Sequence, residues 1–330
     1  MSYDGKIMRR ALQRYDEDKQ RRAAMYEQRR EQLFARVPRL EEIETQLRGT
    51  LSQIIASALR RGTDPLPAIR VIRDENLDLQ RERTDLLMAY GYEPDYLDEQ
   101  PNCPLCRDTG YRGSDVCRCL QEYYAREQIA ELSQLLHMGE ETFDTFSFDW
   151  YSTDRGSRNR SPYEVAERNF DTCSDYARYF SQRSGNLLLF GPPGLGKTFL
   201  STCIARVVSE NGHSVVYDTA THLFQRFEAA KFHRDGEESS EEDVQRYLGC
   251  DLLIIDDLGT EMQTSFVQST LYQLVNGRLR SGKKTIINTN LKLDEIEQRY
   301  GAQIRSRIEG EFDLLPFIGE DIRVQKKNRK

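Results

Sequence analysis

The segment GPPGLGKT, residues 191–198, has a spacing of glycines and lysine that suits the binding of nucleotide phosphates. It fits the pattern G-x-x-x-x-G-K-[ST], follows the apolar run NLLLF and opens the helical pattern KTFLSTCIARVV. Glycines let backbone N–H groups close around phosphate oxygens, and the start of a helix adds a favourable dipole. We therefore expect a phosphate-binding loop here, in which Lys197 bridges the β and γ phosphates and Thr198 ligates Mg²⁺.

Two consecutive acids follow the apolar run LLII, within LLIIDD at 252–257. At the end of a buried strand, acids are costly unless an ion compensates their charge. We expect Asp256 to hold the Mg²⁺ shell and Asp257 to orient or polarise an attacking water. The alternative is a surface turn that happens to carry two aspartates.

The next apolar run, KTIINTN, ends at Asn290, beside the expected position of Asp257. A neutral amide there can fix a water near the γ phosphate. Asn288 competes for this role and is displaced by two residues along the strand. Taken together, these features predict hydrolysis of a nucleoside triphosphate such as ATP, with Mg²⁺ as the metal.

Four arginines follow: Arg299, Arg305 and Arg307 lie in RYGAQIRSRIEG, and Arg323 lies in GEDIR. An arginine that reaches the γ phosphate of another subunit stabilises the charge of the transition state. For each arginine taken singly, a solvated surface position is the alternative.

The thiol cluster CPLCRDTGYRGSDVCRCL has the spacing Cys-x2-Cys, ten residues, Cys-x-Cys. Its members are Cys103, Cys106, Cys117 and Cys119. Zinc is bound tetrahedrally by four thiolates, and a site with four thiolates leaves no open position. We therefore predict a structural zinc site; redox chemistry or chance is the alternative. The isolated thiols are interpreted as small buried hydrophobic residues; they are Cys173, Cys203 and Cys250.

Five short apolar runs alternate with helical stretches from about residue 160 onward. They are residues 186–190, 214–218, 251–256, 284–289 and 314–318. This alternation predicts an α/β fold with a parallel sheet between helices. The phosphate loop and the two acids would then follow neighbouring strands.

Upstream of the cysteines, residues 1–100 are predicted to form three charged helices, broken near Pro38 and at 60–67. They would form either a small self-packed bundle or a partner surface. A helix is expected near 121–137. The aromatic segment TFDTFSFDWY, residues 142–151, is interpreted as an extended docking segment.

The chain has 330 residues and a formal net charge of −7, with 38% hydrophobic and 31% charged residues. This composition suits about two domains, with part of the chain as solvated helix. A signal-peptide pattern and an apolar run of about 18 residues are both absent from the sequence. We therefore expect a soluble cytoplasmic protein without membrane contact, whose thiols are reduced.

The nucleotide-binding motifs and the cysteine cluster together make the chain resemble the bacterial DnaC/DnaI-type replicative helicase loaders. These are AAA+ ATPases close to the IstB-like transposition helpers. The marks are CPLCRDTGY…CRCL, TFDTFSF, GPPGLGKT, LLIIDDLG, INTN, SRIEG and GEDIR, over about 100–325. The resemblance implies three parts: helical partner-binding residues 1–100, a zinc module over 101–140 and an AAA+ domain over 141–330. About twelve residues follow the fifth predicted strand, so a full C-terminal lid is not expected.

The resemblance also implies roles for residues. The Walker A and adjoining nucleotide contacts would be Gly191, Pro192, Pro193, Gly194, Leu195, Gly196, Lys197, Thr198, Phe199 and Arg323. Asp256 and Asp257 would be Walker B, Asn290 sensor 1 and Arg323 sensor 2. The trans arginine finger, which reaches the γ phosphate bound by another subunit, would be an arginine of IRSRI, with Arg307 favoured over Arg305. The family's element for single-stranded DNA falls at about 222–243, where stacking and phosphate contacts would come from Lys231, Phe232 and Arg234.

The implied function is ATP-dependent loading of a hexameric, DnaB-type helicase onto single-stranded DNA, with ATP, Mg²⁺ and Zn²⁺ bound and self-assembly through a trans arginine. Many AAA+ ATPases carry Glu where this chain has Asp257, so slow hydrolysis by the isolated protein is expected. An IstB-like transposition helper, or a phage-borne relative with another client, is the main alternative. A small-molecule kinase and a non-catalytic zinc adaptor for DNA are further alternatives.

Overall fold

The computed structural model describes residues 3–58, 66–136, 141–157, 159–181, 183–232 and 238–329. The chain divides into two compact units. The first contains Met1–Gln13 together with Arg118–Lys330, and the second contains Arg14–Cys117. The division predicted at residues 100 and 140 stays a prediction. Within the described ranges, every helix is too short or too polar to cross a membrane.

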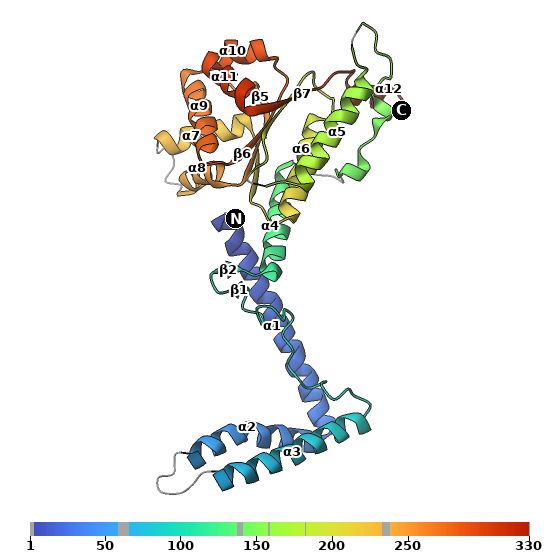
Figure 1. Ribbon diagram of the computed structural model, residues 1–330, viewed down its shortest axis with the longest axis vertical. Coiled ribbons are helices and arrows are strands. Elements are labelled where there is room, and N and C mark those ends of the chain that lie inside the picture. The colour runs from blue at the N-terminus through green and yellow to red at the C-terminus, as the bar shows by residue number, and fades with distance from the viewer. Residues whose placement is uncertain are drawn as a thin grey trace. The chain divides into compact units, whose positions relative to one another are not determined.

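The centre of the first unit is a five-stranded parallel sheet with the strand order β4-β5-β6-β3-β7 (Figure 1). Its strands are β3 (Asn186–Phe190), β4 (Val215–Thr219), β5 (Leu252–Leu258), β6 (Lys284–Thr289) and β7 (Phe312–Pro316). The helices of this unit that flank or join the strands are α4 (Arg118–Leu136), α5 (Pro162–Arg178), α6 (Lys197–Glu210), α7 (Ala220–Phe232), α8 (Glu238–Gly249), α9 (Ser265–Arg280), α10 (Leu293–Tyr300), α11 (Ala302–Glu311) and α12 (Ile322–Asn328). The predicted α/β class is confirmed.

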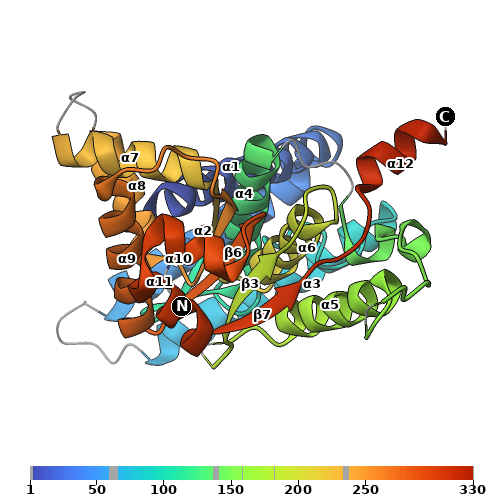
Figure 2. The same ribbon diagram turned by 90° about the horizontal axis from the view of Figure 1, so that it is seen from above.

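Alternate residues of each strand face opposite sides of the sheet, as a pleated strand requires. In β5, Leu252 and Ile254 pack on the side of α5 and α6, whereas Leu253 and Ile255 pack on the side of α9. Figure 2 shows α5 and α6 on one side of the sheet and α9 and α11 on the other. Because both faces are covered, the strands read as nearly continuous apolar runs.

The fifth strand differs from the prediction by two residues. We expected it at 314–318, but β7 begins at Phe312. It pairs with β3 in parallel from Asn186↔Phe312 onward, so the two strands begin side by side. Phe317 lies beyond the strand and is still buried. A prediction from hydrophobicity alone therefore starts this strand two residues too far along the sequence.

The aromatic segment 142–151 is not extended, so that prediction is wrong. It forms two single 3₁₀ turns, η1 (Phe143–Thr145) and η2 (Phe148–Trp150). Its short polar side chains form local hydrogen bonds that compete with an extended backbone; the Ser147 hydroxyl, for example, accepts from the Asp149 N–H at 3.3 Å. The segment does dock, because the Phe146 ring lies 5.5 Å from that of Phe199 on α6.

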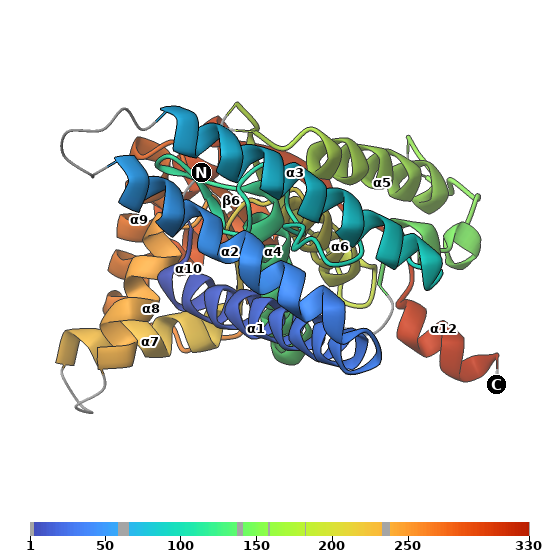
Figure 3. The ribbon, with the colours of Figure 1, turned by 90° about the horizontal axis from the view of Figure 1, so that it is seen from below.

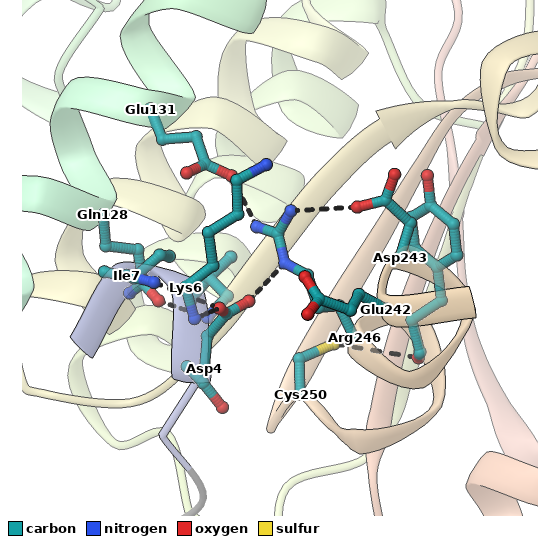
Figure 4. Close-up of polar contacts among 12 residues, drawn as sticks. Asp4, Lys6, Ile7, Gln128, Glu131, Glu242, Asp243, Arg246 and Cys250 are labelled. Atoms are coloured by element: carbon teal, nitrogen blue, oxygen red, sulfur yellow. Dashed lines mark hydrogen bonds and ion pairs between the residues drawn. The ribbon is translucent and has the colours of Figure 1, made fainter. Parts of the chain in front are cut away.

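The first turns of helix α1 (Gly5–Arg36) belong to the first unit. Asp4 caps this helix, and its backbone N–H donates to the Tyr124 hydroxyl of α4 at 2.9 Å. Arg246 of α8 donates to the Asp4 carboxylate and, at 2.5 Å, to Glu131 of α4 (Figure 4). A charge network thus joins three helices that are far apart in the sequence.

The second unit contains the rest of α1, helices α2 (Pro38–Ala58) and α3 (Leu66–Ala89), and the short hairpin of β1 (Tyr111–Arg112) and β2 (Asp115–Val116). Figure 3 shows α2 and α3 side by side. The Arg39 guanidinium binds the Glu82 carboxylate through two bonds, of 2.7 and 2.9 Å. The predicted helical N-terminal region is confirmed.

Candidate nucleotide-binding site

The loop between β3 and α6 has glycines where its backbone is left-handed or closely approached. The φ angles of Gly191, Gly194 and Gly196 are +137°, +72° and +84°. A Cβ on Gly191 would lie 2.2 Å from the Phe317 carbonyl oxygen, and one on Gly194 would lie 1.9 Å from Asp321 Oδ1. The glycines are therefore needed for packing against 317–321 as well as for an approach to phosphate.

The Lys197 side chain lies within this loop and is only 6% exposed. Its Nζ donates to the carbonyl oxygens of Gly191 and Pro192, both at 2.7 Å, and to Asn290 Oδ1 at 2.8 Å. Burial lowers the pKa of Lys197 to about 8, against the opposing effect of Asp257. Phosphate oxygens are the acceptors that would favour its charged form.

Thr198 and Asp256 meet at the carboxyl edge of the sheet. The Thr198 hydroxyl lies 3.1 Å from Asp256 Oδ2, and Asp256 is only 5% exposed. When the hydroxyl donates to the carboxylate, its lone pairs remain available to a cation. Mg²⁺ prefers oxygen ligands and retains several waters. These two residues therefore fit a magnesium shell, with Thr198 as the direct ligand.

Asp257 has a strained backbone at the end of β5. Its φ is +52°, in the left-handed region that costs a non-glycine residue about 1–2 kcal/mol. The pairing of β5 with β6 shifts register between Ile255 and Leu258, so the two acids lie in an irregularity of the sheet. Asp257 lines the pocket. Partial burial and the neighbouring Asp256 raise the pKa of its carboxyl.

Asn288 lies within β6 and Asn290 directly follows it, and the two side chains have different surroundings. Asn290 lines the pocket and accepts from Lys197. Asn288 is only 1% exposed, and its Nδ2 donates to Asp256 Oδ1 at 2.9 Å and to Ser201 Oγ at 2.7 Å. Of the two, Asn290 therefore has the position expected for the amide near the γ phosphate.

Helix α12 brings Arg323 to the same pocket. The Ile322 N–H donates to the Gly194 carbonyl oxygen at 3.0 Å, which ties the start of α12 to the phosphate loop. Farther along, Arg329 Cζ lies 4.5 Å and Lys326 Nζ 5.5 Å from the centre of the Trp150 ring, as in cation–π pairs. The helix is thus held at both ends.

The pocket between these elements has a volume of about 520 Å³, within the range of small-molecule sites. Eight of the residues expected to contact the nucleotide line it: Pro193, Gly194, Leu195, Gly196, Lys197, Thr198, Phe199 and Arg323. The aromatic segment forms another wall, where the Tyr151 hydroxyl donates to the Leu195 carbonyl oxygen at 3.0 Å. The remaining two, Gly191 and Pro192, accept from Lys197.

The arginines of α10 and α11 are not in this pocket. Arg299 pairs with the buried carboxylate of Glu261 at 3.3 Å. Arg305 contacts three acids of its own unit, which are Asp294 at 2.7 Å, Glu297 at 2.5 Å and Glu309 at 3.1 Å. Arg307 is exposed and shares a surface hollow with Arg280. The surroundings of Arg307 are therefore better suited to reaching another molecule.

Two of the three predicted DNA contacts, Lys231 and Phe232, lie at the end of α7. Phe232 is 51% exposed, and Lys231 Nζ lies 5.7 Å from its ring centre and 5.1 Å from that of Phe266. Phe266 belongs to α9, so a second aromatic ring adjoins this basic group. Arg234, the third predicted contact, lies outside the described residues.

The four clustered cysteines converge. The Sγ atoms of Cys103, Cys106, Cys117 and Cys119 all lie within 4.8 Å of one another. The Cys103 and Cys117 sulfurs are 3.8 Å apart, close to the edge of about 3.8 Å of a tetrahedron with Zn–S bonds of about 2.3 Å. Three of the four thiols are buried. This cluster could bind a metal, and its residues fit zinc.

The isolated cysteines are buried as predicted: Cys173, Cys203 and Cys250 are 0%, 0% and 5% exposed. Burial raises the pKa of the Cys203 thiol to about 12, which keeps it protonated and unreactive.

Sequence reasoning missed two residues that line the pocket and one that lies behind it. Tyr217 of β4 donates to Asp256, and Trp150 and Tyr151 line the pocket. Tyr217 lies near the end of an apolar run. Parallel pairing of this run with the strand that contains Asp256 would have placed the two residues close together. The aromatic segment carried no such signal, because its rings approach the loop only in the fold.

Comparisons with known proteins match an ATP-binding family to the part of the chain that contains this site. The family described as IstB-like ATP binding protein matches residues 168–329. The replicative helicase loader DnaC of Escherichia coli is 27% identical over 146 residues, which are 43% of this chain and 58% of that protein. An insertion sequence ATP-binding protein of Sinorhizobium fredii is 34% identical over 96 residues, 29% of this chain and 31% of that protein.

Two solved structures match part of this chain, both with a TM-score under 0.5 and at low sequence identity. The DnaC helicase loader crystal structure has a TM-score of 0.43 and 21% identity, covering 54% of this chain and 97% of that one. The DnaI crystal structure has a TM-score of 0.44 and 16% identity, covering 57% and 92%. The curated relatives named above are each matched over less than two thirds of their own length.

Proposed function

We propose that residues 168–329, which match the family described as IstB-like ATP binding protein, form an AAA+ ATP-binding domain of the DnaC/IstB type, and that the protein is an ATP-dependent loader of a hexameric replicative helicase. It would bind the helicase through its helical N-terminal residues and contact single-stranded DNA through its ATPase unit. Hydrolysis of ATP would shift the protein between a state that binds the helicase and a state that releases it. This requires that its affinity for the helicase differ between the two nucleotide states.

The observation that carries the hydrolytic part is the convergence of Lys197, Thr198, Asp257, Asn290 and Arg323 on one pocket. Lys197 and the loop N–H groups would hold the phosphates, and Arg323 would add positive charge from α12. Bound Mg²⁺ would neutralise charge between the β and γ phosphates. Asp257 and Asn290 would orient the attacking water, a role that suits their position at the carboxyl edge of the sheet.

The partner role is supported by the character of the second unit. A hollow of about 1340 Å³ is lined by α1 and by the segment 93–108, with both cationic and acidic side chains. The exposed charges of α1 suit a polar protein surface rather than a buried core. The fold of the four-thiolate segment would depend on its metal, because so short a segment has little core of its own.

The DNA role is supported by the surface at the end of α7. Phe232 and Phe266 flank Lys231, and aromatic rings beside a basic group suit base stacking combined with phosphate contact. Phe266 adds a ring that is distant in the sequence. Salt should weaken this contact strongly, since single-strand binding releases counterions.

Size-exclusion chromatography with light scattering tests the proposal. The protein is mixed with the replicative helicase of its own host, with and without ATP and Mg²⁺. We expect a complex that is lost in the Cys103→Ser/Cys106→Ser double variant and retained in Cys173→Ser, whose thiol is buried away from the cluster. Separate elution of folded, zinc-loaded protein under every nucleotide condition would show that its client is another protein.

A second candidate is a transposition helper, favoured by the IstB-like family match and by the insertion sequence relative. The ATPase site would be the same, and only the client would differ. Co-purification with a transposase, together with failure to bind the helicase, would favour this role. A Lys197→Ala variant should lose nucleotide-dependent activity in either case.

A further inference from the structure

Asp256 is a buried carboxylate whose hydrogen-bond donors are neutral. Within the described part of the chain, its four donors are the hydroxyls of Thr198 and Tyr217, the Asn288 amide and the Asp257 backbone N–H. A carboxylate has about four lone-pair sites, so these donors can occupy all of them. Such a set holds the carboxylate in one orientation.

Tyr217 supplies the shortest of these bonds, with its hydroxyl 2.8 Å from Asp256 Oδ2. The side chain is 1% exposed and packs on the α6 side of the sheet. Parallel pairing puts Thr219 opposite Asp256 and Tyr217 opposite Ile254, so the tyrosine is a diagonal neighbour of the acid. A phenol is protonated at neutral pH, so Tyr217 is the donor in this bond.

Ser201 closes the network from α6, one turn after Thr198. Its hydroxyl lies 3.3 Å from the Tyr217 hydroxyl and accepts from Asn288 Nδ2 at 2.7 Å. Strands β4, β5 and β6 and helix α6 therefore each contribute a side chain to one buried polar cluster. Hydrogen bonds that link several buried side chains restrict the positions of all of them.

We propose that Tyr217, supported by Ser201 and Asn288, is a positioning residue that sets the affinity of the nucleotide site for Mg²⁺. It orients the Asp256 carboxylate, which in turn orients the Thr198 hydroxyl toward the cation. This inference rests on the proposed ATP site and adds a residue behind it that touches neither nucleotide nor metal. Partners of this kind typically change metal affinity by about 10–100-fold when removed.

The test is the Tyr217→Phe variant, which removes one oxygen and keeps the ring. Calorimetric titration with ATP is repeated over a series of free Mg²⁺ concentrations. We expect the Mg²⁺ concentration for half-maximal enhancement of ATP binding to rise about tenfold or more. ATP binding without Mg²⁺ should change little, because the phosphate loop is untouched.

The matched control is Tyr247→Phe. Tyr247 is also buried, and its hydroxyl donates at 2.6 Å to a different carboxylate, that of Asp218, outside the pocket. It should lower thermal stability by a similar amount without altering the Mg²⁺ requirement. Ser201→Ala, a smaller change, should give an intermediate shift and provides a second test should Tyr217→Phe fold poorly.

An unchanged Mg²⁺ requirement in both Tyr217→Phe and Ser201→Ala, with normal Mg²⁺-dependent ATP binding by the parent protein, would overturn the positioning role alone. Absence of Mg²⁺-dependent ATP binding in the parent protein would overturn the proposed site itself. The two failures are therefore distinguishable in one set of titrations.

Discussion

Arg246 of α8 donates to the carboxylate of Asp4, which lies 242 positions earlier in the sequence. The same guanidinium binds Glu131 of α4, and Asp243 lies 3.4 Å away (Figure 4). Asp4 is only 5% exposed at its side chain and Arg246 only 17%. Because Asp4 also caps α1, this pair anchors the start of that helix in the first unit.

We predict that Arg246→Met destabilises the first unit by about 3–5 kcal/mol, because it leaves the buried carboxylate of Asp4 without its cation. Asp4→Asn should lower the free energy of unfolding by less than Arg246→Met does. The double variant should lower it by less than the sum of the two single variants. Urea unfolding of the single and double variants measures this coupling. Arg9→Met is the control, since Arg9 is 71% exposed and lies 3.9 Å from Glu242. Equal effects of Arg9→Met and Arg246→Met would contradict the prediction.

ATP binding should weaken as pH rises through about 8, because the pKa of Lys197 is about 8 before phosphate binds. Below that pH the ammonium is present and this residue adds no pH dependence; above it, affinity should fall by up to about tenfold per unit. Calorimetry in buffers from about pH 7 to about pH 9.5 measures this slope and the accompanying proton uptake.

The same shift has the opposite sign for stability. The folded state binds the Lys197 proton less tightly than the unfolded chain, so raising the pH from about 8 toward 10.5 should stabilise the fold through this residue. A Lys197→Met variant should lack this contribution. If wild type and Lys197→Met show the same change in melting temperature over that range, the lysine is not the titrating group.

Arg307→Ala should lower ATP hydrolysis by self-assembled protein by about 10³-fold, as expected for a trans arginine. Mixing it with Lys197→Ala, which lacks the site but retains the arginine, should restore part of the rate. Arg305→Ala should mainly lower stability, because Arg305 already contacts three acids of its own unit. Loss of turnover in Arg305→Ala, with Arg307→Ala fully active, would reverse the assignment.

Purified protein should contain about one zinc ion per chain, since four converging thiolates form one closed tetrahedral site. Elemental analysis should find that Cys103→Ser lowers this content and that Cys173→Ser does not. Chelation should also increase protease cleavage between residues 101 and 120, because metal binding contributes folding energy there. Wild-type protein that is folded but free of zinc would contradict the expectation.

The sequence predicts some elements of this fold more accurately than others. The apolar runs at 186–190 and 284–289 coincide with β3 and β6, because a strand covered on both faces is apolar throughout. The edge strand β7 was placed two residues too late, since its bounds depend on pairing with β3. The aromatic residues of the segment 142–151 suggest an extended chain, but its polar side chains favour local turns.

The sequence by itself determined the phosphate loop, the two acids after a buried strand and the four-thiolate cluster, because each depends on residue type at short spacing. The tertiary structure alone decided which of Asn288 and Asn290 lines the pocket, which arginine is left exposed, and that Tyr217 donates to Asp256. Those relationships depend on strand order, register and side-chain burial. Such quantities arise from contacts between residues far apart in the chain, so no local pattern encodes them.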